Sequence, residues 1–388
     1  MSHAVVIGAG IGGLTAAVAL SQEGWTVTVL EQAASIEPVG SGLAIAPNAL
    51  RALDMIGIGD EVRKLSAIQG EGGIRRPDGR WLTRTDTDAM TARYGDPVVL
   101  LPRAKLVDLL AVRLPPGALH LNRRVESVDP ETGRVVTADG TFDADLIVAA
   151  DGIRSATRTT LFPGHPQPRY TGVTSWRIVV PADREADPPQ ACETWGDGTL
   201  FGVMPMAGGQ VYCYATAAAP PGARALDEKD ELIRLFGDWL DPIPALLTAA
   251  DPAAVLRHDI YSLDRPLPAF HRGRAVLLGD AAHPMTPNLG QGACQAIEDA
   301  AVLARRAGAA VEAGEAVEAG EAVDLAAYSR ERVPRTTRIV RRSRAIGRLT
   351  MWRSRPAVIL RDTLLLTMGA LGTNAAFRQA DEIFHWPG

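Results

Sequence analysis

The sequence has few cysteines, few aromatic residues and no long apolar run. Its three cysteines, Cys192, Cys213 and Cys294, are far apart in a chain of 388 residues and form no CxxC pair. This spacing argues against a disulfide framework and against a cysteine-ligated metal site, so we predict no metal and a cytoplasmic location. Aromatics make up only 5% of the chain, but hydrophobic residues make up 46%, which is enough for a sizeable core.

Positive charge comes almost entirely from arginine, because Lys64, Lys105 and Lys229 are the only lysines. The net charge is −5, whereas nucleic-acid-binding proteins usually carry an excess of positive charge, so the charge gives no sign of nucleic-acid binding. The N-terminus shows no basic segment followed by a long apolar stretch, so we expect no signal peptide. The most apolar late segment, 357–371, contains Arg361 and Asp362 and is too short and too charged to span a bilayer. We therefore expect a small-molecule substrate as partner, no nucleic acid, no membrane, and a monomer or homodimer.

A glycine-rich turn follows the first apolar run of the chain. Residues 4–8 predict a buried parallel strand, 11–23 a helix, and 26–30 a second strand that is closed by an acid. In this β-α-β setting the turn matches Gly-x-Gly-x-x-Gly, the pattern of a dinucleotide site. The first glycine permits a tight turn, the second lets the backbone approach a pyrophosphate, the last lets the helix pack on the strand, and the acid accepts hydrogen bonds from a ribose. The predicted cofactor-binding residues here are Gly8, Gly10, Gly12, Gly13 and Glu31.

A second segment, residues 277–292, distinguishes FAD from NAD. It runs from a strand through Asp280 into a Pro/Gly loop and then into a helix. An acid at a strand end can bind a polyol hydroxyl, such as one on the ribityl chain. The loop before the helix directs N–H donors at one spot, which suits the negative charge on N1 and O2 of a reduced flavin. Pro287, Gly290 and Gly292 are therefore candidates for FAD binding and for a catalytic role.

Three motifs stand in a fixed order along most of the chain. They are Gly8–Gly13, Asp151-Gly152 with Arg158 shortly after it, and Gly279-Asp280. With this trio the sequence resembles the para-hydroxybenzoate hydroxylase superfamily, the group A flavoprotein monooxygenases, and in particular its salicylate-hydroxylase-like, urate-hydroxylase-like and zeaxanthin-epoxidase-like members. The resemblance implies tight, non-covalent FAD, NADH or NADPH as a transient co-substrate, and O2. The lack of a second Gly-x-Gly-x-x-Gly unit agrees with a nicotinamide that binds only transiently.

The resemblance also implies roles for residues outside the three motifs. Arg103 matches an arginine that contacts FAD, and Val125 matches a backbone contact to the adenine. Asp151 lies where FAD and the nicotinamide both pass, and the segment 41–44 matches the stretch beside the isoalloxazine. The other residues that we assign to the cofactor are Gly42, Ala44, Gln291 and Ala293.

The order of the strand and helix patterns predicts an α/β (α+β) chain. We expect a Rossmann-like FAD-binding domain at 1–170 and 268–310, an inserted antiparallel-sheet substrate domain at 171–267, and a C-terminal helical region at 311–388. Residues 100–114 are expected to form a helix. The segment 311–322 repeats Val-Glu-Ala-Gly-Glu-Ala, and we interpret it as a solvated surface insertion.

The resemblance implies that NAD(P)H reduces FAD, that O2 then forms a C4a-hydroperoxyflavin, and that its distal oxygen is transferred to an electron-rich carbon. We therefore predict an enzyme, an FAD monooxygenase that hydroxylates or epoxidises its substrate. The sequence leaves open an FAD-dependent dehydrogenase or reductase without oxygen transfer, a flavin halogenase, or a non-catalytic flavin sensor. A halogenase is disfavoured because residues 175–181 lack the second tryptophan of the Trp-x-Trp-x-Ile-Pro stretch.

The predicted substrate domain offers few charges. The runs 199–204 and 210–214 contain no basic residue, and a buried anion without a partner is very costly. We therefore predict a neutral, largely apolar aromatic or polyene substrate, oriented by one or two hydrogen bonds. Arg177 is the main threat to this prediction, because its strand would be able to aim it inward. The candidate pocket residues are Leu200, Phe201, Met204, Tyr212 and Tyr214.

Overall fold

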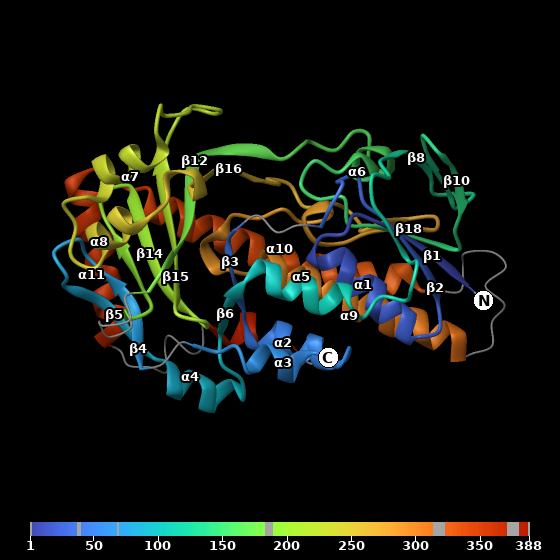
Figure 1. Ribbon diagram of the computed structural model, residues 1–388, viewed down its shortest axis with the longest axis horizontal. Helices are drawn as coiled ribbons and strands as arrows, with labels where there is room; N and C mark the ends of the chain where they lie inside the picture. Colours follow the sequence, from blue (N-terminus) through green and yellow to red (C-terminus); the bar gives the residue numbers. More distant parts are fainter. Residues whose placement is uncertain are drawn as a thin grey trace.

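The computed structural model describes residues 2–36, 40–67, 70–182, 189–312, 323–370 and 380–386. Two sheets lie at opposite ends of an elongated molecule, and long strands and helices connect them (Figure 1). One end carries the parallel sheet and the N-terminus, and the other carries a broad twisted sheet (Figure 1). The repeated segment 311–322 lies for the most part outside the described residues, so its predicted surface position is not addressed.

The sheet at the N-terminal end is parallel except at one edge. Its core is built from runs of buried Val, Ile, Leu and Ala, as expected for strands that are covered on both faces. The β1-α1-β2 unit begins it, and the chain returns later to add strands on the other side of β1. The strand order is β17 (His271–Arg272), β18 (Ala275–Leu277), β11 (Leu146–Ala149), β1 (His3–Ile7), β2 (Thr26–Leu30) and β7 (Leu119–His120).

The second large sheet is antiparallel in five of its strands. Their hydrogen-bonded order is β16 (Leu256–Ser262), β12 (Arg169–Pro181), β15 (Gln210–Ala218), β14 (Thr199–Met206) and β13 (Cys192–Trp195). Two further strands extend it, β4 (Glu71–Arg75), which pairs with β13 in parallel, and β5 (Trp81–Asp86). The sheet is thus larger than the predicted range of 171–267, because residues from the first third of the chain complete its edge.

The remaining strands in the described residues form two smaller sheets. One is formed by β10 (Gly140–Asp143), β9 (Arg134–Thr137) and β8 (Val125–Asp129), and β9 and β10 form the hairpin at Asp139-Gly140. The other pairs β3 (Gly42–Ile45) with β6 (Val99–Pro102). The predicted helix at 100–114 is therefore wrong at its start: residues up to Pro102 extend as β6, and helix α5 spans Arg103–Ala111. Pairing with β3 keeps this apolar stretch extended.

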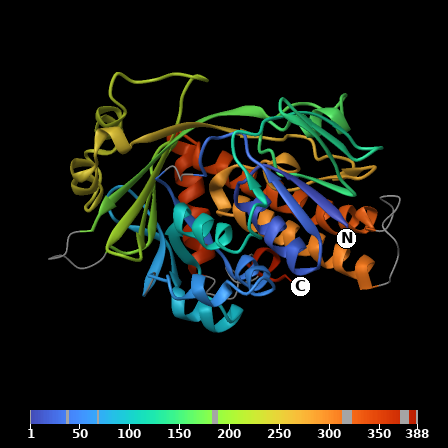
Figure 2. The same ribbon diagram turned by 45° about the vertical axis from the view of Figure 1, so that its right-hand side comes forward.

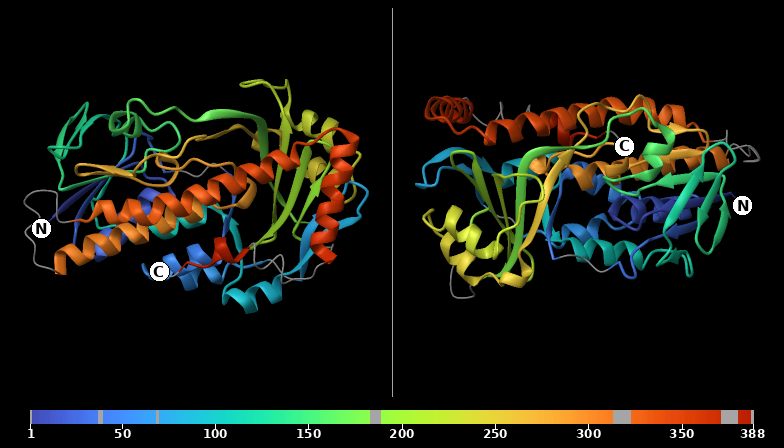
Figure 3. Two further views of the ribbon diagram at one scale, coloured as in Figure 1. Left: turned by 180° about the vertical axis from the view of Figure 1, so that it is seen from behind. Right: turned by 90° about the horizontal axis from the view of Figure 1, so that it is seen from above.

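Helices cover the parallel sheet and bridge the two ends. The long helices α9 (Gly292–Glu312) and α10 (Leu325–Thr350) run side by side, and α11 (Arg355–Ala370) packs against β5 at the far end (Figure 3). No helix in the described residues has both the length and the apolar run needed to cross a bilayer. The remaining helices are α1 (Ile11–Gln22), α2 (Pro47–Asp54), α3 (Gly59–Arg63), α4 (Thr87–Tyr94), α6 (Ala156–Leu161), α7 (Glu228–Phe236) and α8 (Ile243–Ala249).

Candidate active site

A cavity of about 650 Å³ lies where the glycine-rich turn meets the seven-stranded sheet. Figure 2 shows the two sheets, blue and yellow-green, at the two ends of the molecule. One wall comes from the turn at residues 10–13, from β3, and from the loop at 278–293. The other wall is the inner face of β12, β13, β14 and β15. All three motif regions contribute at least one residue to this lining.

The glycine-rich turn is shaped by close backbone approaches. Gly8 has φ +101°, and a Cβ there would lie 2.5 Å from the carbonyl oxygen of Ala150. A Cβ on Gly13 would lie 1.9 Å from the carbonyl oxygen of Gly8, so the helix can approach the strand only without a side chain. Gly10, in contrast, has no protein atom within 4 Å of its Cβ position and faces the cavity.

Glu31 holds this turn from the end of β2. Its Oε2 accepts a hydrogen bond from the Ala9 amide at 2.7 Å, and its Oε1 accepts one from the Ala33 amide at 2.8 Å. Each carboxylate oxygen keeps a further acceptor position, so Glu31 can still bind a ribose hydroxyl. The structure thus places Glu31 beside the turn, although it does not line the cavity itself.

A buried arginine ties two of the motif loops together. Arg158 is 1% exposed, and its guanidinium donates to the carbonyls of Ala281 at 3.0 Å and Ile153 at 2.7 Å. Ile153 belongs to the Asp151-Gly152 loop, whereas Ala281 follows Gly279-Asp280. The two loops are therefore held in a fixed relation by one side chain. Burial lowers the pKa of Arg158, and the nearby carboxylates of Asp151 and Asp280 act in the opposite direction.

Three charged side chains of the cavity lining influence one another electrostatically. They are Asp280, Arg103 and Arg177. Desolvation raises the pKa of Asp280, although His283, Arg103, Arg158 and Arg177 counteract it. Desolvation and the like charge of Arg177 lower the pKa of Arg103. In the described residues no side-chain hydrogen bond engages Asp280, so its carboxylate can accept from a ligand.

These features fit FAD. The glycine-rich turn and the start of α1 would hold the pyrophosphate, Glu31 the ribose, and Asp280 a ribityl hydroxyl. The backbone from Pro287 to Gly292 would lie against the flavin, because Gly290 adopts φ +61° and the chain then enters α9. FAD, when bound, supplies the redox chemistry, while the protein positions the reacting groups.

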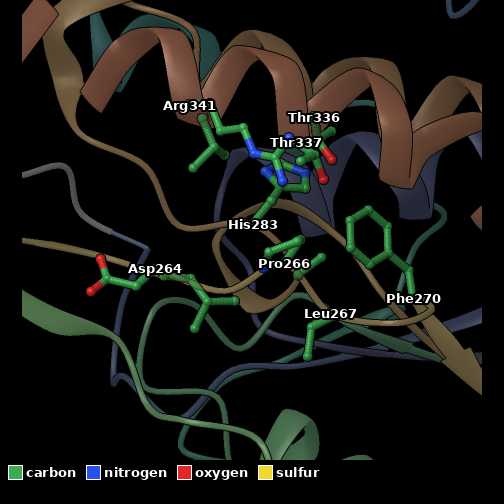
Figure 4. Close-up of a pocket in the computed structure, with 11 residues that line it drawn as sticks. Asp264, Pro266, Leu267, Phe270, His283, Thr336, Thr337 and Arg341 are labelled. Atoms are coloured by element: carbon green, nitrogen blue, oxygen red, sulfur yellow. The ribbon is translucent and has the colours of Figure 1, made fainter. Parts of the chain in front are cut away.

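A buried ionic cluster supports the Gly279-Asp280 loop from behind. Asp299 on α9 accepts a hydrogen bond from the Gly279 amide at 2.9 Å and lies 2.6 Å from Nε2 of His283. Arg332 on α10 bonds both Asp299 and Glu298 at 2.6 Å. Figure 4 shows His283 beneath α10, in a small separate pocket with Phe270 and Thr336. His283 is therefore placed where it stabilises the loop, outside the large cavity.

The sheet wall of the cavity is formed by one face of the seven-stranded sheet. Along β12 and β15 the alternating side chains Ser175, Arg177, Tyr212 and Tyr214 point inward, and Met204 follows from β14. The opposite face packs on α7 and α8 and forms a separate apolar core. Glu193 on β13 also lines the cavity.

Comparison with known proteins identifies the chain. A sequence profile described as "FAD binding domain" matches residues 1–343. An aurachin C monooxygenase/isomerase of Stigmatella aurantiaca is 39% identical over 381 residues, which cover 97% of this chain and 96% of that protein. The chain belongs to the group A FAD-dependent monooxygenases. It is an enzyme that uses FAD as its cofactor, with NAD(P)H and O2 as co-substrates, as the resemblance implied.

Other relatives of this monooxygenase act on different compounds. A 2-heptyl-3-hydroxy-4(1H)-quinolone synthase of Pseudomonas aeruginosa is 32% identical and covers 93% of both chains. An FAD-dependent urate hydroxylase of Klebsiella pneumoniae is 33% identical over 77% of this chain and 80% of its own. The crystal structure of Klebsiella pneumoniae HpxO with FAD and uric acid superimposes over 99% of this chain and 96% of that chain, with a TM-score of 0.87 and 28% identity.

The structure gathers most of the predicted site residues of this monooxygenase around one cavity. Those that line it are Gly10, Gly12, Gly13, Gly42, Ala44, Arg103, Asp280, Pro287, Gly290, Gly292, Ala293, Met204, Tyr212 and Tyr214. Gly8 and Asp151 belong to two of the motif loops but do not line the cavity, and Glu31 at the end of β2 lies beside the glycine-rich turn. Val125 begins β8 and is also absent from the lining.

Three predicted residues point elsewhere. Phe201 lies on the opposite face of β14, where its ring packs edge-on against Phe236 at 5.3 Å between ring centroids. Leu200 shares the inner side of its strand but is buried against Trp195 and Leu365. Gln291 turns into the interface between α2 and α9, where its Oε1 accepts a hydrogen bond from Asn48 at 3.0 Å. Only its backbone remains available to a flavin.

Sequence reasoning missed several lining residues. Ser175 and Thr216 contribute hydroxyls, Leu100 and Val98 contribute apolar surface, and Glu193 contributes a carboxylate. Glu193 is the one charged residue in the run Cys192–Trp195, and no alternation in that run indicates which face of the sheet it takes. Arg177, the residue that most threatens the prediction of a neutral substrate, does face the cavity.

Proposed function

We propose that this monooxygenase uses electrons from NADH or NADPH and one oxygen atom of O2 to hydroxylate or epoxidise a neutral, largely apolar aromatic or polyene compound. Its FAD-binding part would be residues 1–170 and 268–310, except for β4 and β5, which would belong to the substrate-binding sheet. Pro287, Gly290 and Gly292 would present the flavin, while Met204, Tyr212 and Tyr214 would contact the substrate. We further propose that it works in the cytoplasm as a monomer or homodimer.

The observation that carries this proposal is the charge distribution on the sheet wall. Among the described lining residues from this sheet, Arg177 is the single cation, and its charge interacts with Asp280 and Arg103 at the cofactor end. The remaining inward side chains on β14 and β15 are Met204, Tyr212, Tyr214 and Thr216. A carboxylate substrate lying away from Arg177 would have no cationic partner there, and burying it would be costly.

The names of the relatives include a quinolone as well as urate. The name of the Pseudomonas aeruginosa synthase contains a neutral bicyclic ring with an alkyl chain, and that protein aligns with nearly the whole chain. Urate is named for relatives that align with 77% of this chain, and the HpxO structure with uric acid superimposes over 99% of it. Because Arg177 is the single cation among the described lining residues of the sheet wall, we infer that the cavity of this chain suits the first kind of compound better.

Stopped-flow measurement of flavin reduction tests the proposal. Neutral phenols, indoles and 2-alkyl-4-quinolones are compared with benzoate-type anions and urate, with NADH and NADPH each supplied. Neutral compounds should accelerate reduction, and product masses should show one added oxygen atom. Strong acceleration by a small anion that is abolished in Arg177→Ala would overturn the substrate assignment. Nicotinamide oxidation without oxygen insertion would indicate a dehydrogenase or reductase.

A further inference from the structure

A carboxylate lies in the substrate wall of the cavity without a cationic partner. Glu193 on β13 lines the cavity and is partly exposed to it. Its Oε1 accepts a hydrogen bond from the Tyr214 hydroxyl at 2.6 Å, and its Oε2 accepts one from Nε1 of Trp195 at 2.8 Å. No salt bridge in the described part of the chain involves Glu193. Desolvation raises its pKa, although the bonds from Tyr214 and Trp195 act against it.

The position of the Glu193 carboxylate depends on a glycine, Gly202, on the neighbouring strand. Arg177, Tyr214, Gly202 and Glu193 stand in one row across four neighbouring strands. A Cβ on Gly202 would lie 2.3 Å from Cζ of Tyr214, so the tyrosine ring occupies the space above this glycine and reaches Glu193. The row therefore has a cation at one end and an acid at the other. Three strand spacings of about 4.8 Å separate the two backbone positions.

The two internal hydrogen bonds leave acceptor capacity unused. A carboxylate offers roughly four lone-pair positions, and two of them are taken by Tyr214 and Trp195. A desolvated carboxylate binds N–H or O–H donors strongly and repels a second anion. A neutral aromatic ring that carries one donor satisfies this side chain, whereas a carboxylate-bearing analogue would bring two negative charges together.

We propose that Glu193 is a specificity-determining residue that accepts a hydrogen bond from a ring N–H or O–H of the substrate. This inference rests on the proposed function, because it assumes a neutral aromatic compound in this cavity. Glu193 turns the donor edge of the ring toward β13, and Tyr214 keeps the carboxylate oriented. Enol, phenol, indole and 4(1H)-quinolone groups carry such a donor. Compounds that lack it bind weakly, and anions are excluded at this end of the cavity.

Methylation of the donor tests this directly in the FAD-loaded enzyme. The probes are 2-heptyl-4(1H)-quinolone, indole and 2-naphthol, each beside its N-methyl or O-methyl match. Dissociation constants are read from the change in flavin absorbance without NAD(P)H. In the parent enzyme, methylation should weaken binding of at least one probe by about ten- to a hundredfold, the effect of losing a hydrogen bond to a charged group. In Glu193→Gln this penalty should shrink by about tenfold.

A control lies on helix α7, which packs against the opposite face of the same sheet. Glu228 also accepts a hydrogen bond from a tryptophan, Nε1 of Trp176 at 2.8 Å, but it does not line the cavity. Glu228→Gln should therefore leave the methylation penalty unchanged. Glu193→Asp is a second variant, should Glu193→Gln not yield folded, FAD-loaded protein. It keeps the negative charge but withdraws the carboxylate from the cavity by one methylene, so its methylation penalty should also shrink.

Two outcomes would overturn the inference. One is that no donor-bearing probe binds the parent more tightly than its methylated match. The other is an equal methylation penalty in the parent and in Glu193→Gln, which would assign Glu193 only to holding Tyr214 and Trp195. An undiminished penalty in Glu193→Asp would have the same meaning. Because these are binding measurements, failure of the proposed oxygen insertion would show separately, in the product masses.

Discussion

Replacing Arg332 by methionine should destabilise the protein strongly, and more so at neutral than at acidic pH. Arg332 is completely buried and bonds two buried carboxylates, Glu298 and Asp299. Burial by itself would raise the pKa of Asp299, but His283 and Arg332 outweigh it and lower that pKa to about 2. A carboxyl whose pKa falls from 3.8 to about 2 on folding contributes on the order of 2 kcal/mol at pH 7. That contribution is complete above pH 3.8 and is lost as the pH falls through 2.

Methionine keeps much of the volume but removes one of the two side chains that lower the pKa of Asp299, and it leaves Glu298 with Arg335 alone. Removing one partner of a buried ion pair costs about 3–5 kcal/mol, so the free energy of unfolding at pH 7 should fall by that amount. The loss should be smaller at pH 4.5, because without Arg332 desolvation acts on Asp299 with less opposition, so its pKa rises relative to the parent and protonation becomes easier. Urea titration followed by far-UV circular dichroism, with FAD in excess, measures both values.

Arg305 on α9 provides the control for this prediction. Its guanidinium bonds the Glu331 carboxylate at 3.0 Å, but both side chains are about a third exposed. Arg305→Met should therefore cost less than about 1 kcal/mol. The reasoning fails if Arg332→Met costs no more than Arg305→Met, or if its cost is the same at both pH values.

Three further predictions concern the cofactor. Asp280→Ala should weaken FAD binding by about ten- to a hundredfold in titrations of the apoprotein, because a charge-assisted hydrogen bond is lost, and equal affinities would remove Asp280 from the site. Gly13→Ala should destabilise the fold, since its Cβ meets the Gly8 carbonyl at 1.9 Å, whereas Gly10→Ala should fold normally and bind FAD weakly. Thermal unfolding with and without FAD separates these two effects. Denaturation should release the flavin into solution, and flavin that stays with the precipitated chain would contradict non-covalent binding.

The cofactor side of the site was predictable because its signals are local in the sequence. Gly8, Gly13 and Glu31 lie within one β-α-β unit, and each has a steric or hydrogen-bonding reason to be that residue type at that spacing. The same holds for Asp280 and the Pro/Gly loop before α9. Local sequence patterns were not enough to predict strand β6. Residues 100–102 continue an apolar pattern that suits a helix, and only pairing with β3 keeps them extended.

The substrate side was decided by the tertiary structure. The seven-stranded sheet is buried on both faces, on one side against α7 and α8 and on the other around the cavity. Alternation of polar and apolar residues therefore gives no signal for which face a residue takes. Phe201 and Tyr214 are both aromatic residues in adjacent strands, yet they lie on opposite faces. Register, rather than residue type, selects which one reaches the cavity.

By itself, the sequence determined that this chain binds FAD and belongs to a monooxygenase family, because those properties depend on short motifs with fixed spacing. Folding decided which distant side chains share one environment. Arg158 meets the carbonyl of Ala281, 123 positions away along the chain, and Arg332 meets Asp299, 33 positions away. The role that we propose for Glu193 depends on its contact with Tyr214 and on its place in the cavity. A carboxylate becomes selective for donors when burial removes the water that would otherwise solvate it.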